Sequence, residues 1–102
     1  MDNAVNEIVT AYAKRVYDEF KSKAIYLLGS YARGNQTSHS DIDVAVVFND
    51  VPNDKYMAIY GKLWEVAGQF DGRIEPKLLI DDGVEDRFSM LYEVARTGQM
   101  IH

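Results

Sequence analysis

A chain of 102 residues, of which 47% are hydrophobic and 26% charged, has the composition of one globular domain with a packed core, which we place over residues 1–102. The absence of cysteine excludes disulfides and thiolate metal sites, and no apolar run is long enough to cross a bilayer. A net charge of −5 argues against a protein that holds long nucleic acid through bulk positive charge. The first residues lack the basic and apolar segments of an export signal, so we expect a cytoplasmic protein.

The first half of the chain predicts one helix followed by two strands. Apolar residues recur at helical spacing over residues 3–21. The apolar run AIYLL has the length of a strand and stops at Gly29. The next segment predicts a short helical turn over 31–33 capped by Ser30, and then a polar loop. From Asp41 the chain enters IDVAVVF, a second apolar strand.

The second half predicts a helix, a strand and a further helix. Apolar positions form one helical stripe over residues 54–70. The run RIEPKLLI, residues 73–80, predicts a third strand, and a last helix is predicted around 84–97 with Gly98 as its stop. This order of elements indicates an α/β (α+β) fold, a small mixed sheet of about three strands flanked by about four helices.

Two aspartates one residue apart stand at the entrance of the second strand. Residues two apart in a strand point to the same side, so Asp41 and Asp43 share a face and can ligate one hard cation or bridge two. A solvated turn is the alternative for Asp-x-Asp alone. The upstream Gly29-Ser30 turn, however, offers backbone N–H groups and a hydroxyl to a phosphate. An anion cradle beside a cation site suits a metal–nucleotide complex.

The motif GSYARG at 29–34, followed by SDID at 40–43, resembles the signature of the nucleotidyltransferase superfamily that includes DNA polymerase beta. The short length makes the chain most similar to the minimal nucleotidyltransferases. The resemblance implies the nucleotidyltransferase fold, with Asp41 and Asp43 holding two Mg²⁺ ions. It also implies that Ser30 and the backbone of Gly29 bind the terminal phosphates of the nucleotide, with Arg33 as a further phosphate contact.

The family pattern calls for a third acid on the next strand, and Glu75 stands at the right place. Strand alternation places it with Arg73 and Lys77, on the face opposite the apolar side chains. Pro76 indicates an edge strand or a bulge at this point. The resemblance implies that Glu75 completes a metal site and helps to deprotonate the attacking hydroxyl. The alternative is a surface salt bridge from Glu75 to Arg73 or Lys77.

The implied reaction is the Mg²⁺-dependent transfer of a nucleoside monophosphate, AMP from ATP, to a hydroxyl acceptor. Minimal nucleotidyltransferases commonly accompany HEPN-domain toxins as antitoxins, so the resemblance implies a HEPN toxin as partner and one of its tyrosines as acceptor. Two alternatives stay open: a non-enzymatic module that neutralises a partner by contact alone, and a small-molecule nucleotidyltransferase of the antibiotic-modifying type. The sequence also leaves homo-oligomer formation open.

Overall fold

The computed structural model describes residues 3–29, 41–84 and 86–102. The predicted helical turn over 31–33 and the polar loop after it lie outside the described residues. The described elements, in chain order, are α1 (Asn3–Phe20), β1 (Ala24–Leu27), β2 (Ile42–Phe48), a 3₁₀ turn η1 (Asn53–Lys55), α3 (Tyr56–Phe70), β3 (Ile74–Ile80), α4 (Met90–Thr97) and β4 (Gln99–Met100). Within the described ranges, no helix is both long and apolar enough to span a bilayer.

The four strands of the described residues form one mixed sheet in the order β3-β2-β1-β4. Strand β1 pairs antiparallel with both β2 and β4, whereas β2 and β3 run parallel. The register between β2 and β3 is unbroken from the pair Ile42 and Ile74 to the pair Phe48 and Ile80. Pro76 therefore lies in an edge strand, one of its two predicted settings, and not in a bulge.

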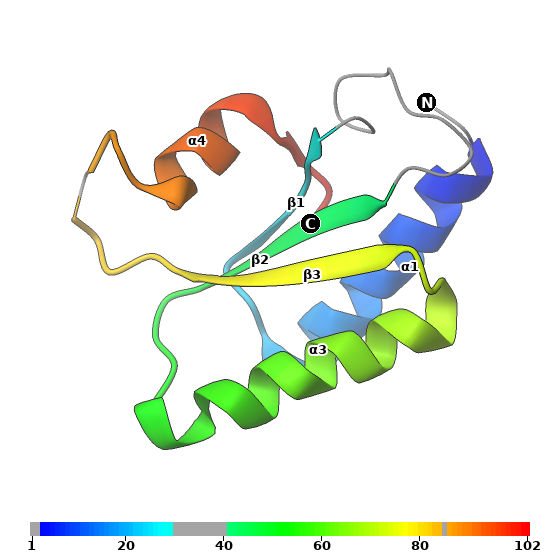
Figure 1. Cartoon of the computed structure of the whole chain (residues 1–102), viewed down its shortest axis with the longest axis horizontal. Coiled ribbons are helices and arrows are strands. Elements are labelled where there is room, and N and C mark those ends of the chain that lie inside the picture. The colour runs from blue at the N-terminus through cyan, green and yellow to red at the C-terminus, as the bar shows by residue number, and fades with distance from the viewer. Residues whose placement is uncertain (1–2, 30–40, 85) are drawn as a thin grey trace.

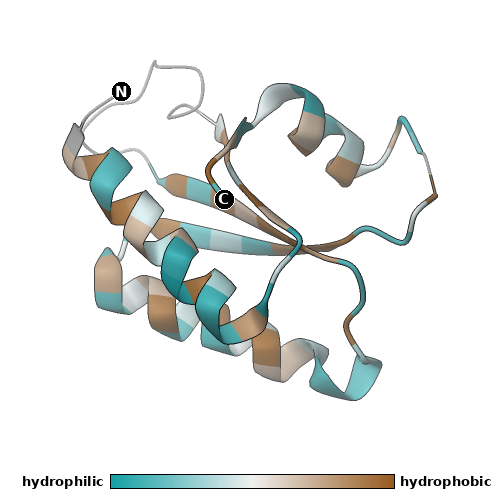
Figure 2. Ribbon diagram, turned by 180° about the vertical axis from the view of Figure 1, so that it is seen from behind, coloured by the Kyte–Doolittle hydropathy of each residue, from teal (hydrophilic) through white to brown (hydrophobic). Residues whose placement is uncertain are grey.

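Helices cover both faces of the sheet. Helices α1 and α3 lie on one face and α4 crosses the other (Figure 1). Both α1 and α3 show alternating hydrophobic and hydrophilic bands along their length (Figure 2), as expected for helices with one face on a core and one in water. The buried Tyr12 hydroxyl of α1 donates a hydrogen bond to the carbonyl oxygen of Leu63 in α3 at 3.0 Å, and burial raises the Tyr12 pKa. This bond links the two helices across the core.

The last helix is shorter than its sequence pattern predicts. It begins at Met90, whereas the prediction placed its start near residue 84. The carboxylate of Asp86 accepts a hydrogen bond from the backbone N–H of Phe88, and such local bonds compete with helix formation. The hydroxyl of Ser89 then accepts from the N–H of Tyr92, which makes Ser89 the N-cap. The end at Thr97, with Gly98 after it, agrees with the prediction.

The fourth strand was not predicted. Strand β4 has only two residues, Gln99 and Met100, both exposed, and two residues cannot show an alternating pattern. It forms because the chain after α4 returns along β1, where the N–H of Ile101 donates to the carbonyl oxygen of Ile25 at 2.8 Å. The sheet therefore has four strands where the sequence indicated about three.

Gly98 joins α4 to β4 at a point where a side chain has no room. An ideal Cβ there would lie 2.7 Å from the carbonyl oxygen of Val94 and 2.8 Å from Cδ2 of Leu28. We predict that Gly98→Ala lowers the free energy of unfolding by about 1–3 kcal/mol, because the helix end or Leu28 must shift. Urea denaturation measures this change.

Gly61→Ala is the matched control, because a Cβ at Gly61 in α3 would meet nothing within 4 Å. This substitution should raise the free energy of unfolding by about 0.5–1 kcal/mol through helix propensity. Equal effects of the two substitutions would contradict the packing assigned to Gly98.

Candidate active site

The parallel pairing of β2 with β3 brings two predicted site residues together. Asp43 is the register partner of Glu75 on the neighbouring strand. Its chain neighbours Ile42 and Val44 are fully buried among the core residues under α1 and α3. Because successive side chains of a strand alternate, Asp43 and Glu75 project to the other face, the face that α4 crosses (Figure 1). Asp41 is exposed and directly precedes β2.

The two aspartates act electrostatically on Glu75. The negative charge of Asp41, partial desolvation and the hydrogen-bonding carboxylate of Asp43 raise the pKa of Glu75. Such mutual repulsion is expected where a cation neutralises a group of acids. In the described part of the chain, however, no three acidic or histidine side chains already surround a point that could hold an ion. The acids are neighbours without forming a closed coordination shell.

A lysine supplies positive charge next to this group. The ammonium nitrogen of Lys77 lies 3.9 Å from Oδ1 of Asp43, and the Lys77 charge counteracts the rise in the Glu75 pKa. Lys77 pairs in register with Ala45, which lies two residues after Asp43 on β2. The Lys77 side chain therefore extends back along the strand to approach the Asp43 carboxylate. Arg73, the other basic residue near Glu75 in sequence, forms an ion pair with Asp71 at 2.8 Å and lowers the pKa of that carboxyl.

The end of β1 comes close to the carboxylate of Asp43. The N–H of Leu28 donates to the backbone carbonyl of Asp43 at 2.8 Å. Gly29 then adopts a positive φ of 66°, and an ideal Cβ at Gly29 would lie 3.1 Å from Oδ2 of Asp43. The glycine of the Gly-Ser motif therefore allows the backbone to turn beside this acid. Ser30 and Arg33, the other predicted phosphate contacts, lie outside the described residues.

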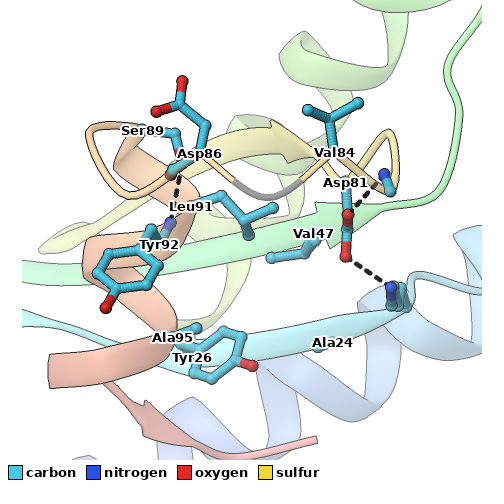
Figure 3. A pocket seen from close by; sticks show the side chains of 12 residues that line it. Ala24, Tyr26, Val47, Asp81, Val84, Asp86, Ser89, Leu91, Tyr92 and Ala95 are labelled. Carbon is cyan, nitrogen blue, oxygen red and sulfur yellow. Dashed lines mark hydrogen bonds and ion pairs between the residues drawn. The ribbon is translucent and has the colours of Figure 1, made fainter.

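A cavity of about 390 Å³ opens on the same face of the sheet as the carboxylates. Leu91 and Tyr92 of α4 lie on one side of it, with Val47 and Tyr26 of the sheet facing them (Figure 3). Lys23 and Asp81, which form an ion pair at 2.6 Å, also line the cavity. The sequence analysis missed this cavity, because its walls come from segments that only the tertiary fold brings together.

Comparison with known families agrees with this architecture. A family model described as "Nucleotidyltransferase domain" matches residues 9–94, a range that includes Asp41, Asp43 and Glu75. The chain belongs to this nucleotidyltransferase family. The resemblance that the motif between Gly29 and Asp43 indicated is thereby confirmed at the level of the family.

Curated relatives carry a more specific name. A protein of Methanocaldococcus jannaschii, named provisionally as a protein adenylyltransferase, is 40% identical over 67 residues, which are 63% of this chain and 67% of that protein. The protein adenylyltransferase MntA of Thermococcus cleftensis is 35% identical over 49 residues, 48% of this chain and 50% of that protein. The match thus covers 67% of the first relative and half of the second.

Two solved structures share the fold. A Sulfolobus solfataricus protein, described provisionally as a nucleotidyltransferase, superimposes with a TM-score of 0.57 at 21% identity over 84% of each chain. A chain from a structure titled "toxin-antitoxin with AMP-PNP" superimposes with a TM-score of 0.59 at 25% identity, over 91% of this chain and 72% of that chain. The predicted nucleotidyltransferase fold is confirmed.

The contact between Gly29 and Asp43 leads to a prediction. Gly29→Ala should lower the free energy of unfolding by about 2–3 kcal/mol, because alanine is strained at positive φ and its Cβ must push the Asp43 carboxylate aside. Gly83→Ala is the control, because Gly83 has a φ of 84° and a Cβ there would meet nothing within 4 Å. This substitution introduces backbone strain alone and should lower the free energy of unfolding by about 1–2 kcal/mol.

Denaturation of both variants in wild-type and Asp43→Ala backgrounds separates the two causes. The excess cost of Gly29→Ala should disappear when the Asp43 carboxylate is removed. If Gly29→Ala still costs more than Gly83→Ala in the Asp43→Ala background, the contact with the Asp43 carboxylate contributes nothing to the cost of Gly29→Ala.

Proposed function

We propose that this protein is a Mg²⁺-dependent nucleotidyltransferase that transfers AMP from ATP to a hydroxyl of a partner protein. The observation that carries the proposal is the pairing of Asp43 with Glu75 across parallel strands, beside Asp41, with the pKa of Glu75 raised by the other two acids. Acids that repel one another at half-exposed positions cost stability unless a ligand uses them. The family match and the names of the relatives support the same reaction.

The donor set fits a hard divalent cation. Mg²⁺ prefers carboxylate oxygens and binds through one or two carboxylates together with substrate phosphates. Asp41, Asp43 and Glu75 would hold the metal, two ions in the proposed complex, once their side chains turn toward a common point. Bound Mg²⁺ would neutralise phosphate charge and favour loss of the proton from the attacking hydroxyl.

Residues of the chain take part in the transfer step and bind the phosphates of the nucleotide. The acceptor oxygen attacks the α-phosphorus, the bond from that phosphorus to the bridging oxygen of the β-phosphate breaks, and pyrophosphate leaves. The carboxylate of Glu75 would help to take the proton of the acceptor hydroxyl. We assign Gly29, Ser30 and Arg33 to the phosphates of the nucleotide. Gly29 supports this assignment, since its backbone lies beside the Asp43 carboxylate.

The proposed acceptor is a tyrosine of a HEPN-domain toxin, with this protein acting as its antitoxin in the cytoplasm. The name of the relatives, protein adenylyltransferase, supports a protein as acceptor. The structural neighbour titled "toxin-antitoxin with AMP-PNP" supports a toxin as partner. Neutralisation by contact alone is the second candidate. It is favoured by Lys77, whose ammonium nitrogen lies 3.9 Å from Oδ1 of Asp43 and already places positive charge beside this acid.

A thermal-shift measurement tests the cation site. Mg²⁺ with ATP should raise the melting temperature of the wild-type protein by mass action. The double variant Asp41→Asn, Asp43→Asn should fold but lose this shift. The control Asp50→Asn, Asp54→Asn makes the same charge change at two exposed residues outside the site, and it should keep the full shift. An equal shift in both double variants would refute the metal assignment.

Transfer itself is tested with the purified product of the adjacent gene as acceptor. Mass spectrometry should detect one or more AMP additions to that protein in the presence of ATP and Mg²⁺. Glu75→Gln should slow the transfer by about a hundredfold or more while largely keeping nucleotide affinity, because it removes the proposed general base. Glu75→Asp should recover part of the rate.

The control Glu65→Gln neutralises an exposed acid on α3 and should leave the transfer rate unchanged. A Glu75→Gln variant with a near-normal rate would make Glu75 a surface residue. Full protection against the toxin by the Asp41→Asn, Asp43→Asn variant would favour neutralisation by contact.

A further inference from the structure

The segment between β3 and α4 exposes apolar side chains to an unusual degree. Phe88 is 100% exposed, Val84 70% and Met90 58%, and Ile80 at the end of β3 is 39% exposed. Single exposed apolar residues are ordinary on a protein surface, but four within eleven positions are concentrated in one place. These four residues, Ile80, Val84, Phe88 and Met90, are named here the β3–α4 patch.

Local hydrogen bonds hold the backbone of the segment that carries the β3–α4 patch. The hydroxyl of Ser89 donates to the carbonyl oxygen of Asp86 at 2.8 Å and caps α4. Three backbone N–H groups donate to aspartate side chains two residues earlier, each at 2.9 Å: Gly83 to Asp81, Val84 to Asp82 and Phe88 to Asp86. These bonds fix the local backbone at Val84 and Phe88, whose side chains are exposed.

Hollows flank the patch. Val84 and Leu91 line both the cavity of about 390 Å³ and a second cavity of about 170 Å³. In Figure 3 Val84 stands at the rim of the larger cavity, while Leu91 points inward toward Val47. The protruding apolar side chains of the patch can enter pockets on a partner protein. The two cavities beside the patch can in turn receive side chains of that partner.

The larger cavity lies on the same side of the sheet as the carboxylates. Tyr26 and Val47 form part of the wall of the larger cavity, and Tyr26 pairs with Ala45, two residues along β2 from Asp43. At about 3.3 Å per residue, the cavity begins roughly 7–13 Å from Asp43. A macromolecule seated here can place a side chain at the acids.

We propose that the β3–α4 patch and the larger cavity form the docking surface for the protein that accepts AMP. The inference rests on the proposed function. The sequence from residue 81 to residue 90, DDGVEDRFSM, has four acids and one arginine, and one of the acids, Asp81, is paired with Lys23. Charge complementarity therefore selects a partner surface that presents apolar side chains flanked by lysine or arginine.

Substitution of Phe88 tests the docking surface. The purified product of the adjacent gene serves as the probe, with its Kd measured by calorimetry and its KM measured in the AMP-transfer assay. Phe88→Ser should weaken binding and raise KM by about tenfold or more, as expected for a central aromatic contact. It should leave kcat at saturating partner, the melting temperature and the Mg²⁺–ATP shift unchanged, because Phe88 is fully exposed and contributes nothing to the core.

Met57→Ser is the matched control. Met57 is 71% exposed on α3, the helix on the other face of the sheet, so the control removes a comparable apolar side chain away from the patch. Equal Kd values for Phe88→Ser and Met57→Ser would overturn the proposal. So would a dimer of this chain that Phe88→Ser converts to monomers, because a second copy would then cover the patch.

The two proposals fail in different ways. Transfer to the partner with a KM that does not depend on Phe88 would refute the docking surface and leave the proposed reaction intact. Binding that depends on Phe88, without any AMP transfer, would refute the reaction and support docking by contact alone.

Discussion

The parallel pairing of β2 with β3 is the constraint on which the rest of the structure depends. Its register sets Asp43 against Glu75 on one face, and Val44 against the buried Pro76 on the other. The second face is covered by α1 and α3 and forms the main core, so a shift by one residue would bury the carboxylates and expose that core. Folding energy thus holds two acids side by side although they repel one another.

The antiparallel pairing of β1 completes this arrangement from the other side. It brings Gly29 beside the Asp43 carboxylate, where only a residue without a Cβ meets neither backbone strain nor the acid. At the far edge of β1, Gly98 lets the end of α4 pack against Leu28. Two glycines therefore adapt the backbone on either side of one short strand. The acids and the larger cavity lie on a single face of the sheet.

The sequence predicted strands β1, β2 and β3 and the faces of their side chains, because these features depend on local alternation. It predicted the three acids from one motif and from the alternation along β3. Burial along β3 alternates from Ile74 to Leu79 as the pattern RIEPKLLI predicts, but Ile80 is exposed. Pro76 occupies an edge strand. The sequence could not locate β4, whose two residues acquire a partner only through tertiary contact. Nor could it place the start of α4, because the bonds made by Asp86 and Ser89 outweigh a helical apolar pattern. The contact of Gly29 with Asp43 and the cavity walls depend on packing between distant segments.

Transfer of AMP and neutralisation by contact would use the same docking surface, so the carboxylates decide between them. Lys77 now supplies the positive charge beside Asp43, and a bound divalent cation would take over this role. The most direct measurement is a crystal structure with Mn²⁺ and a non-hydrolysable ATP analogue, with the metal located from its anomalous signal. The account predicts an anomalous peak bound by oxygens of both Asp43 and Glu75, with the Lys77 ammonium displaced from Asp43. An ordered nucleotide without a metal peak at these carboxylates, and with Lys77 still paired to Asp43, would contradict it.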